Sequence, residues 1–125
     1  MIVGIGCDIV DISRMRRELA KGSGEFAARI FTPAEISYCR GKRYPERHFA
    51  ARFAAKEAFF KAVSNGERVD IHWPDIEISN DTNGKPHIDL RREAGRLSQL
   101  RGASRIFVSL SHSDDWAMAT VILES

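Results

Sequence analysis

Apolar residues alternate with small and polar residues at the start of the chain and predict a strand over residues 2–9. Alternation places four side chains on one face, those of Val3, Ile5, Cys7 and Ile9. The opposite face carries Ile2, Gly4, Gly6 and Asp8. Two glycines beside an aspartate leave room for a ligand or another backbone to approach this face.

Helices are expected after this strand. Asp11 or Ser13 can cap a helix over residues 14–20, which Gly22 ends, and a short helix is expected over 26–30. The segment Thr32-Pro33-Ala34-Glu35 combines the capping-box spacing with proline at the first helical position, so it predicts another helix, which ends near Gly41.

The longest predicted helix covers residues 46–63. At about 100° per residue, one apolar stripe contains Val63, Phe49, Phe60, Phe53 and Ala50. Lys56 and Glu57 fall inside this stripe and Lys61 borders it. Charges at such positions indicate either a function or a helix end that emerges from the core into water, and the spacing leaves both interpretations open.

The second half of the chain alternates strands with one helix. Strands are predicted over 73–79 and 86–90, joined through the turn signal Asn83-Gly84. A helix over 91–101 directs Ala94, Leu97 and Leu100 inward, and a second hairpin joins 106–110 to 116–123. The element order predicts an α+β fold, a mainly antiparallel sheet packed by the long helix and shorter helices.

Composition is that of a globular protein, with 125 residues, 43% hydrophobic and 29% charged. We therefore expect a single domain over residues 1–125. No apolar run approaches the roughly 20 residues of a membrane span, no basic leader precedes the first strand, and the two cysteines form no CxxC pair. A cytoplasmic protein without membrane contact is expected.

Charge is unevenly distributed along the chain. The net charge is +2, but residues 14–61 contain twelve basic and five acidic residues. Such segregation indicates a basic face for an acidic partner or a polyanion, although a solvated helix face remains an alternative. RNA binding is a further alternative, but the chain contains no RNP-like aromatic signature, so no nucleic-acid partner is expected.

Two carboxylates, Asp8 and Glu57, lie in apolar or small-residue stretches, where a buried charge needs a partner. If the two carboxylates meet in space, a hard cation bound between them is indicated.

The segment 111–113, Ser-His-Ser, combines groups that suit phosphate binding. A Ser-His-Asp hydrolase is disfavoured, since adjacent strand residues point to opposite faces and no G-x-S-x-G elbow is present. Gly84-Lys85-Pro86 lacks the spacing of a nucleotide-binding P-loop.

Four blocks in order carry a family resemblance: residues 4–10 (GIGCDIV), 53–62 (FAAKEAFFKA), 75–86 (containing DIEI and NGKP) and 110–122 (beginning LSHS). Over nearly the whole chain this pattern resembles the holo-acyl-carrier-protein synthases, the small phosphopantetheinyl transferases. The chain departs from the family over residues 65–70, where a Gly-Thr-Gly type of loop is often found, so no ligand contact is assigned there.

The resemblance implies transfer of the 4'-phosphopantetheine arm from coenzyme A to a serine of apo acyl carrier protein, for fatty acid biosynthesis. Asp8 and Glu57 match the family's magnesium ligands, and Lys61 matches a catalytic residue near the phosphates. Glu57, directly or through a metal-bound water, is the candidate acceptor of the serine proton. Gly84, Pro86 and His112 match positions that line the adenine and 3'-phosphate region of coenzyme A.

The resemblance also implies partners. The carrier is a strongly acidic helical protein that docks on the helix after the first strand, where Arg14, Met15, Arg17 and Lys21 are the candidate contacts. The small members form homotrimers with each active site between two subunits. Polyketide or peptide carriers are alternative substrates that the sequence does not exclude.

Overall fold

The computed structural model describes residues 1–67 and 69–125. Its elements in chain order are β1 (Ile2–Asp11), α1 (Ile12–Ala20), α2 (Glu25–Ile30), α3 (Pro33–Arg40), α4 (Pro45–Val63), the 3-10 helix η1 (Trp73–Asp75), β2 (Ile76–Asn80), β3 (Pro86–Leu90), α5 (Arg92–Leu100), β4 (Arg105–His112) and β5 (Trp116–Glu124). The unusual 65–70 segment includes Arg68, which lies outside the described residues.

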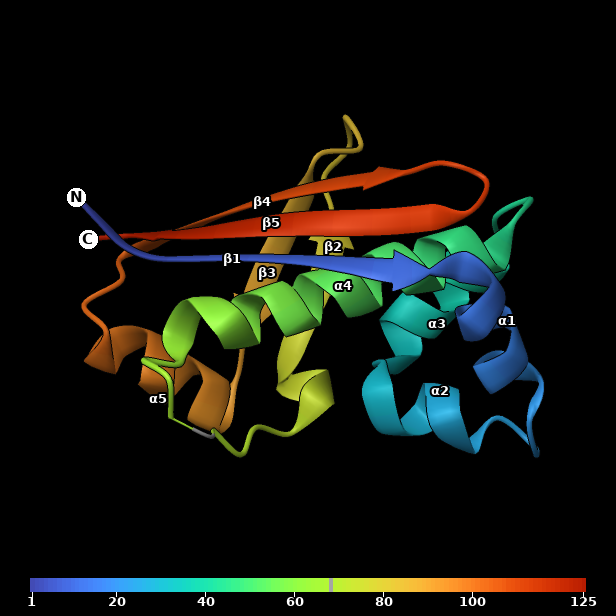
Figure 1. Cartoon of the computed structure of the whole chain (residues 1–125), viewed down its shortest axis with the longest axis horizontal. Coiled ribbons are helices and arrows are strands. Elements are labelled where there is room, and N and C mark those ends of the chain that lie inside the picture. Colours follow the sequence, from blue (N-terminus) through green and yellow to red (C-terminus); the bar gives the residue numbers. More distant parts are fainter. Residues whose placement is uncertain (68) are drawn as a thin grey trace.

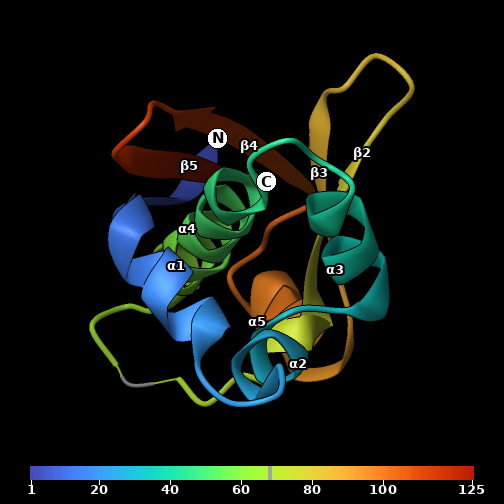
Figure 2. The ribbon, with the colours of Figure 1, turned by 90° about the vertical axis from the view of Figure 1, so that its right-hand side faces the viewer.

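The strands form two antiparallel sheets, one of three strands in the order β1-β5-β4 and one made by β2 and β3. Helix α4 runs along one face of the three-stranded sheet, and both chain ends lie at one end of it (Figure 1). Viewed along α4, helix α1 lies on one side and α3 on the other (Figure 2). The predicted α+β class is confirmed, with the strands divided between two sheets.

Side-chain caps mark the starts of α1 and α3; α1 begins at Ile12, two residues before the predicted start, and α3 begins at Pro33 as predicted. The Asp11 carboxylate accepts hydrogen bonds from the backbone N–H groups of Ser13 and Arg14. The Thr32 hydroxyl accepts from the Glu35 N–H while the Glu35 carboxylate accepts from the Thr32 N–H, which completes the capping box. Each cap satisfies donors that the first helical turn leaves unpaired.

Three expectations need correction. The strand predicted from residue 73 begins at Ile76 instead, because Trp73-Pro74-Asp75 form a turn of 3-10 helix in which Pro74 has no N–H for a ladder. Leu100 ends α5 with 62% of its surface exposed, so it does not face the core. The apolar stripe predicted on α4 is buried or half-buried as expected but incomplete, since this alanine-rich helix is buried on most sides and includes a fully buried Phe59.

The backbones of β1 and α4 approach each other closely. A Cβ atom on Gly6 would lie 1.9 Å from the carbonyl oxygen of Ala58, and one on Gly4 would lie 2.4 Å from that of Ala62. The glycine face of β1 therefore receives another backbone, one of the two possibilities that its small residues allowed. Along the part of the chain that the structure describes, no helix is both long and apolar enough to cross a membrane.

A buried ion pair joins α4 to α3 and to the two-stranded sheet. The Lys56 ammonium and the Glu35 carboxylate are both fully buried, 2.7 Å apart. The ammonium also donates to the carbonyl oxygens of Trp73 and Ile76, and the second Glu35 oxygen accepts from the Ile78 N–H. Burial lowers the pKa of Lys56, but every donor of the ammonium has an acceptor, which offsets desolvation.

Replacing Gly6 with alanine should lower the free energy of unfolding by about 2 kcal/mol or more, because two backbones would have to separate. The matched control is Gly95→Ala in α5, where the nearest atom to the new Cβ is 3.9 Å away; it should be neutral or stabilising by up to about 1 kcal/mol. Urea unfolding measures both. Equal stability of the two variants would contradict the close approach.

Replacing Lys56 with methionine should cost about 3–5 kcal/mol, because the Glu35 carboxylate would remain buried without its cation. The double variant Lys56→Met/Glu35→Gln should regain a substantial part of that loss. Arg96→Met provides the control, since it removes an exposed ion pair with Glu93 and should cost less than about 1 kcal/mol. Denaturant unfolding of these proteins, together with the single variant Glu35→Gln that completes the cycle, tests the coupling, and additive effects of the two core substitutions would disprove it.

Candidate functional site

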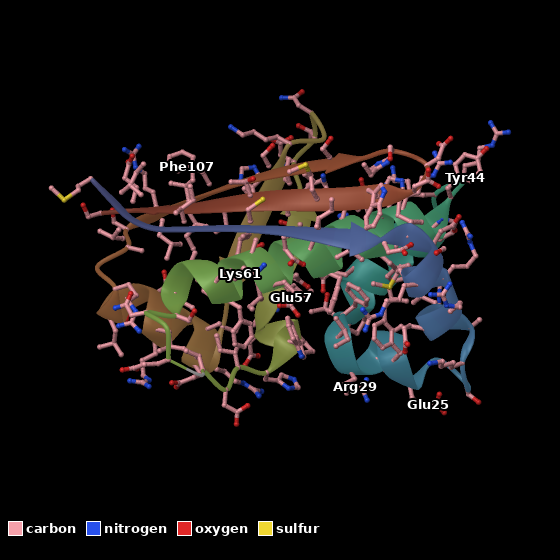
Figure 3. The ribbon with its side chains drawn as sticks, in the orientation of Figure 1. Glu25, Arg29, Tyr44, Glu57, Lys61 and Phe107 are labelled. Carbon is pink, nitrogen blue, oxygen red and sulfur yellow. The ribbon has the colours of Figure 1, made fainter. Side chains whose placement is uncertain are left out.

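The first predicted group of residues lies together, with two of its members in one cavity. Asp8 lies on the face of β1 that packs on α4, and Glu57 and Lys61 extend from α4, one helical turn apart (Figure 3). The Lys61 ammonium donates to Asp8 Oδ1 and to the carbonyl oxygen of Cys7, both at 3.0 Å. Asp8 and Glu57 line a cavity of about 600 Å³ together with residues of β1, α1, α2, α4 and β5: Ile9, Val10, Asp11, Arg14, Met15, Glu18, Phe26, Phe53 and Trp116.

Electrostatic interactions at this site favour an added cation. Burial, and then repulsion from Asp8, raise the pKa of Glu57 above its ordinary value. The hydrogen bond to Asp8 raises the pKa of Lys61, so this lysine remains an ammonium. Two carboxylates thus face one cation, and a second positive charge would relieve the repulsion between them.

Asp8 and Glu57 suit a hard divalent cation such as Mg²⁺, which binds carboxylate oxygens. Within the described residues, no cluster of three or more His, Cys, Asp or Glu side chains could hold a metal by itself. This agrees with the habit of Mg²⁺ to take one or two carboxylates from a protein and its other ligands from phosphate and water. The fit of the pair therefore depends on a phosphate-bearing ligand.

The second predicted group meets in a different cavity, of about 190 Å³. Gly84 and Pro86 come from the β2–β3 hairpin and His112 from the end of β4. Gly84 has a φ of 82°, which an amino acid with a side chain rarely adopts. The remaining lining residues are Tyr38, His48, Ala51, Arg52, Asn80 and Leu110.

Arg52 is a buried cation in the wall of this second cavity. Only 2% of the residue is exposed, its Nη2 donates to Asn80 Oδ1 at 2.5 Å, and its guanidinium lies 4.1 Å from the centre of the Tyr38 ring. Among the residues that the structure describes, none accepts a hydrogen bond from its Nε. A buried guanidinium without a carboxylate partner is suited to an anionic ligand.

Sequence reasoning missed four members of this cavity: Tyr38, His48, Arg52 and Asn80. A signal for two of them was present, because His48, Arg52 and Lys56 follow one another at intervals of four and so form one row along α4. Phe53, Glu57 and Lys61 form a second row at the same interval. His48 and Glu57 are nine residues apart, or two and a half turns, which directs the rows to opposite sides of the helix.

The two cavities therefore lie on opposite sides of α4, and no described residue lines both. The structure brings Asp8, Glu57 and Lys61 together, and separately Gly84, Pro86 and His112. One copy of the chain does not join the two groups into one site.

The expected docking residues divide between surface and core. Arg14 and Arg17 on α1 and Lys21 just after its end are exposed, and Arg14 lines the carboxylate cavity. Met15 is only 3% exposed and packs in the core with Ile12 and Phe49, and it also lines that cavity.

Comparisons with known proteins identify the family of the chain. Residues 4–121 match the family described as the 4'-phosphopantetheinyl transferase superfamily. A holo-[acyl-carrier-protein] synthase of Geotalea daltonii is 48% identical over 124 residues, 99% of each chain. One of Geobacter sulfurreducens is also 48% identical over 124 residues, 99% of this chain and 98% of the relative.

Solved structures share the fold. The synthase of Neisseria meningitidis has a TM-score of 0.88 at 38% identity, with both chains fully covered. The Helicobacter pylori synthase in complex with coenzyme A has a TM-score of 0.82 at 31% identity and covers 96% of this chain and 99% of its own. The chain belongs to the 4'-phosphopantetheinyl transferase superfamily.

Proposed function

We propose that the chain transfers the 4'-phosphopantetheine group of coenzyme A to a serine of apo acyl carrier protein and releases adenosine 3',5'-bisphosphate. The observation that carries this proposal is the cavity lined by Asp8 and Glu57, with the Lys61 ammonium paired to Asp8 beside it. Near full-length relatives at 48% identity are named holo-[acyl-carrier-protein] synthase, and solved relatives contain coenzyme A.

Magnesium is the proposed cofactor. Asp8 and Glu57 would hold it, and the pyrophosphate of coenzyme A would supply further oxygens. When bound, Mg²⁺ neutralises negative charge on the phosphate oxygens. The mutual repulsion of the two carboxylates supports this assignment.

The chemistry assigned to the protein concerns charge and one proton. The carrier serine oxygen attacks the β-phosphorus, a new P–O bond forms, and the bond to adenosine 3',5'-bisphosphate breaks. Lys61, held at Asp8, remains protonated and offsets charge on the phosphates. Glu57 would accept the serine proton directly or through an intervening water; because a carboxylate that holds a metal ion is a weak base, the route through a water is favoured.

The second cavity is assigned to the opposite end of coenzyme A. Gly84, Pro86 and His112 would line the adenine and the 3'-phosphate, and the free Nε of Arg52 would donate to the phosphate. A ligand that spans both groups of residues needs a second copy of the chain, because α4 separates the two cavities of one copy.

A homotrimer with sites between subunits is proposed on the same grounds. The outer face of the three-stranded sheet, on the side away from α4, exposes large apolar residues (Figure 3 labels Phe107). The register places on this face Ile5, Ile9, Phe107, Trp116 and Met118, each at least 41% exposed. An apolar surface of this kind on a small protein indicates a protein interface.

The proposed carrier-docking surface is the exposed face of α1, where Arg14, Arg17 and Lys21 project beside the carboxylate cavity. Complementary charge accelerates the encounter with an acidic carrier and orients it. Fatty acid biosynthesis is the proposed context, with polyketide and peptide carriers as alternative substrates.

Asp8→Asn and Glu57→Gln should each lower the rate of transfer at least about 100-fold while leaving the thermal midpoint within a few degrees of the parent protein. The assay incubates each protein with coenzyme A, Mg²⁺ and apo carrier and follows the mass of the carrier. Asp89→Asn on β3, outside both cavities, is the control and should keep full activity. Near-parental rates in both site variants would contradict the assignment.

Ile5→Lys, on the outer sheet face and outside both cavities, should convert a trimer of three 14.1 kDa chains into monomers and abolish transfer, since buried lysines at an apolar interface are costly. Leu100→Lys is the matched control because Leu100 is equally exposed, at 62% against 63%, but lies on α5 away from this sheet face. Light scattering after size exclusion gives the mass. A monomeric, fully active parent protein would refute the proposed assembly.

A further inference from the structure

A pair of histidines lies beside the buried arginine in the second cavity. His48 from α4 and His112 from β4 pack edge to face with ring centres 5.3 Å apart. His48 also contacts the Tyr38 ring edge to face at 6.1 Å. His48 is half-buried while His112 is exposed, so the pair extends from the cavity wall to solvent.

The charged groups around this pair are almost all positive. Tyr38 on α3 and Asn80 on β2 are uncharged cavity residues, and Asp114 in the β4–β5 turn is ion-paired with Arg47 at 2.9 Å. The pKa of His48 is lowered first by burial and then by repulsion from the neighbouring His112 ring and from the cations Arg52, Lys42 and Arg47. Without an anion, His48 therefore tends to remain neutral near pH 7.

A bound phosphate monoester would reverse this balance. It carries close to two negative charges at neutral pH, and the unpaired Nε of Arg52 offers it a hydrogen bond inside the cavity. A dianion beside two imidazoles favours their charged form, in which both ring nitrogens donate. Anion binding and protonation should then support each other.

We propose that His48 and His112 form a proton-accepting pair, and that a phosphate monoester bound beside Arg52 is held together with a proton taken up by this pair. The inference rests on the proposed function, in which that monoester is the 3'-phosphate of coenzyme A. His48 thereby becomes a residue that determines affinity for the 3'-phosphate as a function of pH. Binding tightens as pH falls from 8.5 toward 6.5, a range in which the phosphate stays mostly dianionic.

The test is titration calorimetry of the whole protein with coenzyme A and, separately, with 3'-dephospho-coenzyme A, both in Mg²⁺. Each titration is run at pH 7.5 in two buffers of different ionisation enthalpy, which gives the number of protons taken up. Wild type should take up roughly half a proton with coenzyme A and little with the dephospho compound. Its dissociation constant for coenzyme A should rise about threefold to tenfold between pH 6.5 and 8.5.

Two variants isolate the role of His48. His48→Phe keeps an aromatic ring against Tyr38 and His112 and should lose most of the proton uptake and most of the pH dependence. His72→Phe removes an exposed histidine outside the cavity and should behave as wild type. His48→Gln serves as a second neutral variant if the phenylalanine protein unfolds, with far-ultraviolet circular dichroism as the check on folding.

The outcomes separate this inference from the proposed function. Tight binding of coenzyme A by wild type without proton uptake, or with uptake that both His48 variants retain, would overturn the role of the histidine pair and leave the transferase assignment standing. No binding of coenzyme A by the wild-type protein would overturn both.

Discussion

The contact between the backbones of β1 and α4 determines the rest of the structure. Gly4 and Gly6 have no Cβ atoms, and the carbonyl oxygens of Ala58 and Ala62 occupy the space that side chains would fill. Because the two glycines and Asp8 share one face of the strand, the same contact directs the carboxylate toward α4. On the helix, Glu57 and Lys61 each precede one of the contacting alanines, so they flank the strand where Asp8 emerges.

A second constraint positions the opposite side of α4. The buried Lys56 ammonium joins the helix to Glu35 of α3 and to carbonyl oxygens next to β2. Arg52, one turn earlier, reaches Asn80 at the end of β2. The β2–β3 hairpin is therefore held against α4 by polar contacts at two successive turns, and this places Gly84 and Pro86 opposite His112. Without hydrogen-bond partners, the buried Lys56 or Arg52 cation would destabilise the core. With their partners on α3, η1 and β2, these two side chains fix the position of the two-stranded sheet.

Much of the fold could be predicted from local signals. The caps at Asp11 and Thr32 and the Asn83-Gly84 turn involve hydrogen bonds and dihedral preferences of residues only a few positions apart. Their positions could therefore be predicted from the local sequence. The burial of Lys56 and Arg52 could not be predicted, because their partners lie 17 to 28 positions away in the chain. Alternation likewise divided β1 into two faces but did not say which one is covered. The apolar face with Ile5 and Ile9 is open, while the glycine face packs on the helix.

That distribution has a physical consequence for the site. Along β5 the buried side chains of Ala117, Ala119, Val121 and Leu123 face α4, and they alternate with outward residues on an apolar face that no described helix covers. A small domain leaves such a surface open at a cost in solubility.

The same sheet holds Asp8 on its β1 edge and His112 on its β4 edge, on opposite sides of α4. Association of copies through the outer face is a route by which the β4 edge of one chain can approach the β1 edge of another. The open apolar face and the divided set of ligand residues are thus two consequences of one arrangement, a three-stranded sheet with a single helix across its middle.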